Sequence, residues 1–139
     1  MVILIDTREQ KPLRFRPDGI LTEVKTEKLE VGDYQARYAD DQVSPVSFER
    51  KSLSDLFGSL AKGYKRFKRE LNRAADLKTK LILAIEGTSE DIERGIPQSG
   101  IEGISILRKL QTLWLRHNVA HVFFPNRPSM ARYIQEFFI

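Results

Sequence analysis

The sequence contains no cysteine and only two histidines among its 139 residues. The absence of cysteine excludes disulfide bonds, thiolate metal sites and a cysteine nucleophile, and it is slightly more typical of a reducing cytosol than of an oxidising compartment. His117 and His121 follow no metal-ligand spacing. We therefore assign neither histidine to a metal and expect any metal ion to be held by oxygen ligands.

Long hydrophobic runs are missing as well. No apolar stretch approaches the roughly 20 residues that are needed to span a bilayer, and the chain opens on the strand-like Val2–Ile5 instead of a charged leader. We expect a soluble protein that is not secreted, has no membrane partner, and lies in the cytoplasm or with the chromosome. The length and the 41% hydrophobic residues suit one domain with a single core.

The charge is only mildly unbalanced. Lysine and arginine number 23 against 19 acidic residues, which leaves a net charge of +4. This balance favours polyanionic partners weakly, because many ordinary basic proteins share it.

Apolar runs alternate along the chain between strand and helix patterns. Val2–Ile5 and 81–85 are short continuous apolar runs, as expected of strands buried on both faces. Shorter strands are predicted over 21–29, 34–39, 43–49 and 119–124, and helices over 101–118 and 129–138. The order predicts an α/β domain with a mixed central sheet flanked by helices.

A further helix is predicted to begin at Ser52. Ser52 and Asp55 form a capping-box pattern ahead of a helical apolar face, whereas Gly58 and Gly63 weaken the case for one unbroken helix. The apolar face carries Leu56, Leu60, Tyr64, Phe67 and Leu71, and we expect Tyr64 and Phe67, like Trp114 farther on, to lie in the core.

The opposite face of this helix is basic. It either contacts a phosphate backbone or is simply the solvated face of an amphipathic helix, and the sequence leaves both readings open. Its cations are Lys62, Lys65, Arg66, Arg69 and Arg73.

Two carboxylates and a lysine form the strongest chemical pattern. Side chains two apart on a strand point the same way, so Glu49 and Lys51 project together and Arg50 points to the other face. A neighbouring strand that starts at Asp33 would add a second carboxylate, although Asp33 taken alone is typical of a turn. Two carboxylates and a nearby cation suit phosphodiester hydrolysis with Mg²⁺ or Mn²⁺.

The ordered residues resemble a known family. Gly32-Asp33, then Glu49-Arg50-Lys51 and Asp55, are similar to the GD…ERKxxxD signature of the XPF-type structure-specific endonucleases, and the segment from Asp6 to Glu9 resembles their DxRE element. The resemblance implies a restriction-endonuclease-like single nuclease domain over residues 1–139. It also implies a metal-dependent endonuclease that cuts DNA at branched structures or at junctions of single strand and duplex.

The resemblance also implies roles for single residues. Asp33 and Glu49 would be ligands of Mg²⁺ or Mn²⁺, joined by the backbone carbonyl of Arg50, and Lys51 would be the catalytic lysine. A free lysine is protonated at neutral pH, which favours charge stabilisation and water orientation over a role as base. Asp55 is either a helix cap or a site residue. Asp6 and Glu9 would be further acidic groups at the site, with Arg8 and Arg50 as phosphate-side or structural partners.

The same resemblance also implies partners and leaves two rival functions open. The resembling nuclease domains pair, and the apolar segments 101–115 and 133–139 suggest a homodimer or a paralogous partner in addition to DNA. One rival function is a catalytically silent DNA-binding subunit, against which Asp33, Glu49 and Lys51 argue. The other is a nuclease that prefers RNA or single strands.

Overall fold

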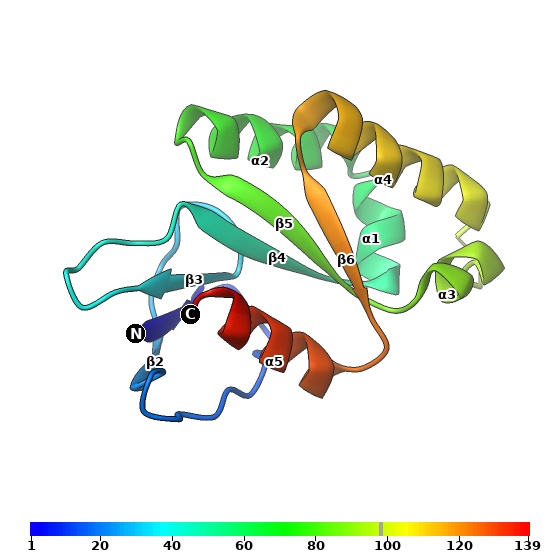
Figure 1. The fold of residues 1–139 in the computed structure, drawn as a ribbon. Helices are drawn as coiled ribbons and strands as arrows, with labels where there is room; N and C mark the ends of the chain where they lie inside the picture. The colour runs from blue at the N-terminus through cyan, green and yellow to red at the C-terminus, as the bar shows by residue number, and fades with distance from the viewer. Residues whose placement is uncertain (98) are drawn as a thin grey trace.

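The computed structural model describes residues 1–97 and 99–139, and a six-stranded sheet forms its centre (Figure 1). The strand order is β2-β1-β3-β4-β5-β6. The strands are β1 (Val2–Ile5), β2 (Glu23–Thr26), β3 (Tyr34–Arg37), β4 (Val46–Ser52), β5 (Lys80–Glu86) and β6 (Ala120–Phe124). The helices are α1 (Leu53–Ser59), α2 (Tyr64–Asp76), α3 (Ser89–Arg94), α4 (Gly103–His117) and α5 (Arg127–Phe137).

The sheet is mixed, as the order of apolar runs predicts. β4, β5 and β6 are parallel to one another, whereas β3 runs antiparallel to both of its neighbours, β1 and β4. β2 pairs parallel with β1 at the edge of the sheet. The prediction of an α/β domain with a mixed central sheet is confirmed.

Helices cover both faces of the sheet and divide the core in two. α1 to α4 lie over one face and α5 over the other (Figure 1). Along β5, Leu83 packs into the core under α1, α2 and α4, while Ala84 packs toward α5. β4 and β5 are paired in register, with Glu49 opposite Leu83. Glu49 and Lys51 therefore face the α1–α2 layer and Arg50 faces the α5 layer.

The helix predicted after Ser52 is two helices. α1 ends at Ser59, and the turn that follows is closed by the Gly63 amide, which donates to the Gly58 carbonyl at 2.8 Å. A Cβ on Gly63 would lie only 3.1 Å from that same oxygen, so glycine suits the close approach. Lys62 consequently lies in the turn and not on α2 with the other cations, which corrects the prediction of one continuous basic face.

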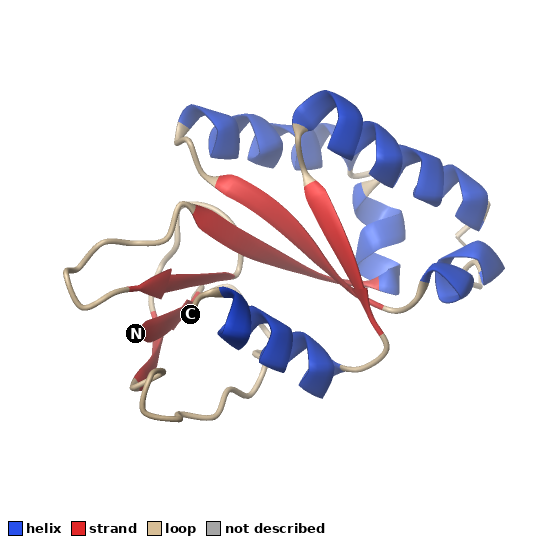
Figure 2. Cartoon of the chain, viewed as in Figure 1, coloured by secondary structure: helices blue, strands red, loops and turns tan. Residues whose placement is uncertain are grey.

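Other expectations change in detail. The long loop after β1 is present (Figure 2), but the strand predicted over 21–29 is shorter, and α3 was not predicted. The placement of Trp114 in the core was wrong, because 56% of it is exposed. α4 buries a narrow stripe through Ile106, Leu110 and Leu113, and Trp114 lies beside it. Phe67 is buried as predicted, and Tyr64 is partly buried.

None of the helices formed by the described residues is both long and apolar enough to cross a membrane.

Candidate functional site

Gly32 turns the chain into β3 so that Asp33 arrives beside β4. Its φ is +75°, a backbone conformation that glycine adopts readily, and a Cβ at this position would collide with the Ser47 hydroxyl. The Asp33 amide donates to the Phe48 carbonyl at 2.7 Å, and the Asp33 carbonyl accepts from the Asp6 amide at 2.8 Å. The backbone of Asp33 is therefore held between β1 and β4.

Asp33 and Glu49 form a partly buried pair of carboxyl groups. Burial raises the pKa of Asp33 to about 6, although the Arg50 backbone N–H, which donates to Asp33 Oδ2 at 2.8 Å, opposes the shift. Burial also raises the pKa of Glu49 well above its ordinary value, and the nearby charge of Asp33 raises it further. Two neighbouring carboxyl groups repel each other when both are ionised, and a cation bound between them offsets that repulsion.

Lys51 is held on the same face as Glu49. Its ammonium lies 4.0 Å from Glu49 Oε1 and donates to Ser59 Oγ at 2.9 Å. It also sits 5.3 Å from the centre of the Phe67 ring, within the range of a cation–π contact. Ser59 and Phe67 come from α1 and α2, so the helical layer fixes the direction of the lysine side chain.

The donor set fits a hard divalent cation. Among the described residues, no group of three or more acidic or histidine side chains converges on one point. Mg²⁺ commonly uses only one or two carboxylates, with waters and substrate phosphates completing its octahedron. The Asp33–Glu49 pair supplies that number of ligands, and the pKa values of both carboxyl groups are raised, chiefly by burial.

Asp6 is buried and its hydrogen bonds come from the protein itself. Oδ1 accepts from the Leu29 amide at 2.8 Å, and Oδ2 accepts from the backbone N–H and Nε of Arg8. Burial opposes ionisation, but these bonds outweigh it and lower the pKa of Asp6. Two thirds of the Arg8 side chain is exposed. In this geometry Asp6 orients Arg8.

Glu9 and Arg50 lie on the opposite face of the sheet from Glu49 and Lys51. Arg50 donates to both oxygens of Glu9, at 2.6 and 2.8 Å, and to Glu86 Oε1 at 2.7 Å. Burial raises the pKa of Glu9, but the Arg50 guanidinium more than reverses this, and the net shift is downward. Glu9 and the Arg50 side chain therefore project from the other face of the sheet, but the charges of both still act on the pKa of Asp33, and the Arg50 backbone N–H donates to its carboxylate.

Four residues that contact the predicted site residues and their ion pairs, or act on them electrostatically, were not predicted from the sequence. Glu86 ends β5 and accepts hydrogen bonds from Arg50 and Arg127. A polar residue at the end of a buried strand was the available signal for Glu86. Glu70 on α2 contributes to the raised pKa of Glu49. Ser59, Glu70 and Arg127 gave no local signal, because only packing of their helices brings them to the network.

The predicted basic surface is exposed. Lys65, Arg66 and Arg69 project from α2 toward solvent, and Arg73 forms an ion pair with Glu30 at 2.7 Å. They lie on the same layer of the fold as Lys51, because α2 also supplies Phe67 beneath its ammonium.

Asp55 is exposed in the first turn of α1. Its backbone N–H donates to Ser52 Oγ at 3.1 Å, which confirms the cap at Ser52. Among the described residues the Asp55 carboxylate accepts no hydrogen bond from the Ser52 backbone N–H, so only half of the predicted capping box is formed.

Replacing Asp33 with asparagine is expected to stabilise the metal-free chain at neutral pH. A carboxyl whose folded pKa is raised to about 6 favours folding below its unfolded pKa and loses that contribution as the pH rises through about 6. Asparagine removes the penalty at pH 7 and can still accept from the Arg50 amide, for a gain on the order of 1 to 2 kcal/mol. Urea unfolding in chelator at pH 7.5 and pH 4 measures the difference, which should vanish at the lower pH.

The exposed Asp76→Asn change serves as the control for this measurement. An Asp33→Asn gain that is equal at both pH values, or no larger than that of the control, would contradict the raised pKa of Asp33.

Comparisons with known proteins identify the family of the chain and two solved structures with a similar fold. A model of the ERCC4 domain matches residues 5–137 of the chain. Among solved structures, XPF from Aeropyrum pernix is similar, with a TM-score of 0.72 and 21% identity over 99% of this chain and 63% of that chain. A second structure of that protein, in complex with DNA, has a TM-score of 0.69 and 19% identity over 97% of this chain and 62% of that chain.

The chain thus spans less than two thirds of the solved chains that it resembles. A search of curated proteins found no match. At this level of identity the likeness to the solved structures shows the fold.

Proposed function

Because this chain belongs to the ERCC4 domain family, we propose that it is a metal-dependent DNA endonuclease that hydrolyses phosphodiester bonds. The observation that carries the proposal is the partly buried Asp33–Glu49 pair with Lys51 beside Glu49 on one face of the sheet. Mg²⁺ or Mn²⁺ is the proposed cofactor. Branched DNA, or a junction of single strand and duplex, is the proposed substrate.

Each side chain has a defined task in this proposal. A divalent cation bound here would polarise the scissile phosphate and make a bound water more acidic. Asp33 and Glu49 hold that ion, and the backbone carbonyl of Arg50 is a further proposed ligand. Lys51 stabilises the charge that develops on the phosphate and orients the attacking water. Arg8, with its exposed guanidinium, contacts a flanking phosphate.

A cleavage assay tests the function directly. The substrates are flap, fork, duplex and single-stranded DNA together with an RNA of the same sequence, each with Mg²⁺ and with excess chelator. We expect products from the branched DNA with Mg²⁺ only. Equal cleavage in chelator contradicts the metal proposal, and faster cleavage of RNA or of plain single strands supports the rival nuclease.

The exposed cations of α2 are proposed to follow the DNA backbone. Replacing Lys65, Arg66 and Arg69 together with glutamine should weaken DNA binding and flatten its salt dependence, by up to about 0.9 in log–log slope per lost phosphate contact. Anisotropy titrations at several salt concentrations measure both effects.

A matched control removes three exposed arginines from the α5 side of the molecule, Arg14, Arg16 and Arg132. A control slope that falls as far as the α2 slope, or an α2 slope that stays unchanged, would return the basic face to an ordinary solvated surface.

We also propose that the chain pairs with a second copy or with a paralogue. Large apolar side chains remain exposed on α4 and at the end of the chain. Burying them against a similar surface would remove apolar area from water, which favours association. They include Ile104, Trp114, Leu115, Tyr133, Phe137 and Ile139.

A further inference from the structure

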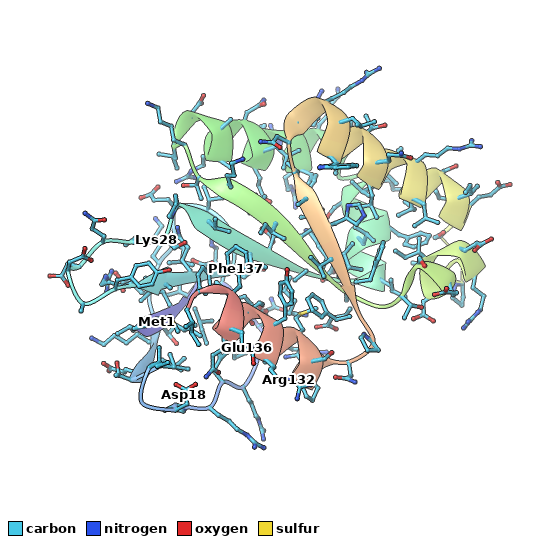
Figure 3. The ribbon with its side chains drawn as sticks, viewed as in Figure 1. Met1, Asp18, Lys28, Arg132, Glu136 and Phe137 are labelled. Atoms are coloured by element: carbon cyan, nitrogen blue, oxygen red, sulfur yellow. The ribbon has the colours of Figure 1, made fainter. Side chains whose placement is uncertain are left out.

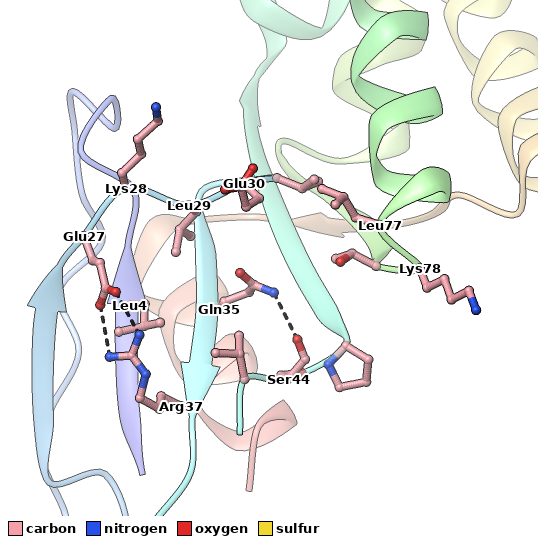
Figure 4. A pocket seen from close by; sticks show the side chains of 14 residues that line it. Leu4, Glu27, Lys28, Leu29, Glu30, Gln35, Arg37, Ser44, Leu77 and Lys78 are labelled. Carbon is pink, nitrogen blue, oxygen red and sulfur yellow. Dashed lines mark hydrogen bonds and ion pairs between the residues drawn. The ribbon is translucent and has the colours of Figure 1, made fainter. Parts of the chain in front are cut away.

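A hollow lies on the sheet face that carries the carboxyl pair. It has a volume of about 420 Å³, which is within the usual range of small-ligand pockets. Its floor comes from β1 and β3, and its rim from the segments 27–31, 43–45 and 77–79 (Figure 4). The Leu29 amide bonds to Asp6 and the Val31 carbonyl accepts from Ser47. The segment from Leu29 to Val31 is thus a wall between the pocket and the site.

The charge on the rim is positive. Glu27 is neutralised by a two-bond ion pair with Arg37, at 2.8 and 3.1 Å, and Glu30 is paired with Arg73. Lys28 and Lys78 have no ion pair among the described residues and are exposed. The two unpaired ammonium groups therefore favour an anionic ligand.

The floor holds one apolar side chain, Leu4, and two polar ones, Gln35 and Arg37, and Arg37 is already paired with Glu27. Gln35 is only 9% exposed, and its Nε2 donates to the Ser44 carbonyl at 3.0 Å. No donor among the described residues reaches its Oε1. An amide can offer an acceptor and a remaining N–H side by side, which is the pattern that pairs with the edge of a nucleobase. Leu4, Leu29 and Leu77 supply apolar surface around it.

Lys78 is positioned on the rim by an unusual backbone. Its φ is +54°, and it follows the C-cap of α2. Its amide donates to the Ala75 carbonyl, and the Thr79 amide to the Ala74 carbonyl. This is the helix ending in which glycine is the usual residue at the position of Lys78. Glycine would therefore fit here without strain, which offers a variant that removes only the side chain.

α2 connects the site to the pocket. Phe67 lies under the Lys51 ammonium and Leu77 lines the pocket, and the ten residue steps from Phe67 to Leu77 rise about 15 Å along the helix axis. Arg69 and Arg73 lie between these ends. A strand whose phosphates follow α2 away from the carboxyl pair would reach the pocket next.

We propose that this pocket binds one unpaired nucleobase of the strand held by the enzyme, with Gln35 pairing to the base edge and Lys28 and Lys78 contacting its phosphates. The inference rests on the proposed function for its substrate class. A base stacked in a duplex cannot enter a pocket of this kind. The pocket therefore selects DNA that is single-stranded about 15 Å from the cleaved bond.

The test measures binding without catalysis. A fluorescent single-stranded thymidine oligonucleotide is compared with one of equal length that carries abasic sugars throughout, in excess chelator. Both have the same phosphates, so a difference reports contact with bases. We expect the wild-type chain to bind the intact strand roughly tenfold more tightly. Lys78→Gly and Gln35→Leu should each weaken the intact strand severalfold. Gln35→Leu should also reduce the preference over the abasic strand to less than about threefold.

Controls separate the pocket from general effects. Arg132→Gln removes one exposed cation from α5, on the other face of the sheet (Figure 3), and should leave the preference unchanged. Lys78→Gly should not lower the melting temperature, so its weaker binding cannot come from unfolding. Equal affinity of the wild-type chain for both strands would overturn the proposal, as would a Gln35→Leu variant that keeps the full preference. The test needs no cleavage, so a chain without nuclease activity still gives a result. A chain that cleaves DNA but shows no preference for the intact strand would contradict the pocket proposal and leave the proposed nuclease function standing.

Discussion

Glu49→Gln is expected to abolish DNA cleavage, with kcat lower by roughly 10³-fold or more, while DNA binding stays intact or becomes tighter. The substitution keeps the shape of the side chain and removes one anionic ligand from the Asp33–Glu49 pair. The scissile phosphate is already negative, and attack on it needs concentrated positive charge. Loss of the ligand removes that charge, whereas loss of a carboxylate near the phosphate lessens repulsion of the DNA.

Three measurements distinguish this explanation from a general loss of structure. Calorimetric titration with Mg²⁺ should show much weaker binding by Glu49→Gln, whereas Lys51→Ala should lose cleavage but retain the metal. Glu136→Gln on α5 removes an exposed acid from the other face of the sheet and should cleave normally. Undiminished cutting by Glu49→Gln and Lys51→Ala would reject the nuclease site as placed here.

Arg50→Met should lower the free energy of unfolding by about 3 to 5 kcal/mol at pH 7. Only 10% of the Arg50 side chain is exposed, and only 3% of the Glu9 side chain. Methionine fills much of the same space but leaves Glu9 and Glu86 without their shared cation. Leaving a buried carboxylate without its partner costs far more free energy of folding than the intact ion pair contributed.

The pH dependence of this effect has a defined sign. The lowered pKa of Glu9 contributes stability above the unfolded pKa of a glutamate, and this contribution is lost as the pH falls through the lower folded value. The deficit of Arg50→Met should therefore shrink between pH 7 and pH 4. Urea unfolding at both values measures it.

Arg37→Met is the matched control, because its ion pair with Glu27 is more exposed and such pairs contribute under about 1 kcal/mol. Adding Glu9→Gln to Arg50→Met should restore part of the loss. An Arg50→Met chain as stable as Arg37→Met would show that the ion pairs of Arg50 with Glu9 and Glu86 do not stabilise the fold.

Local pattern predicted the arrangement within β4. The two-residue period of an extended strand is a property of the backbone, so the sequence alone determined that Glu49 and Lys51 share a face and that Arg50 opposes them. Glycine at position 32 and the Ser52 cap are equally local, because each is required by a single turn of the chain. The apolar runs likewise predicted the mixed sheet.

Tertiary structure decided which distant groups meet these residues. Glu9 pairs with Arg50 across 41 positions of sequence, and Arg127 reaches Glu86 only because α5 packs across the sheet. Ser59 directs Lys51 because the chain turns into α1 directly after β4, and Trp114 is exposed because α4 packs through a narrow stripe. The pocket beside the site is assembled from five separate stretches of the chain. Periodicity constrains only the direction of a side chain from its own backbone, whereas the packing of whole elements sets the partner that it meets.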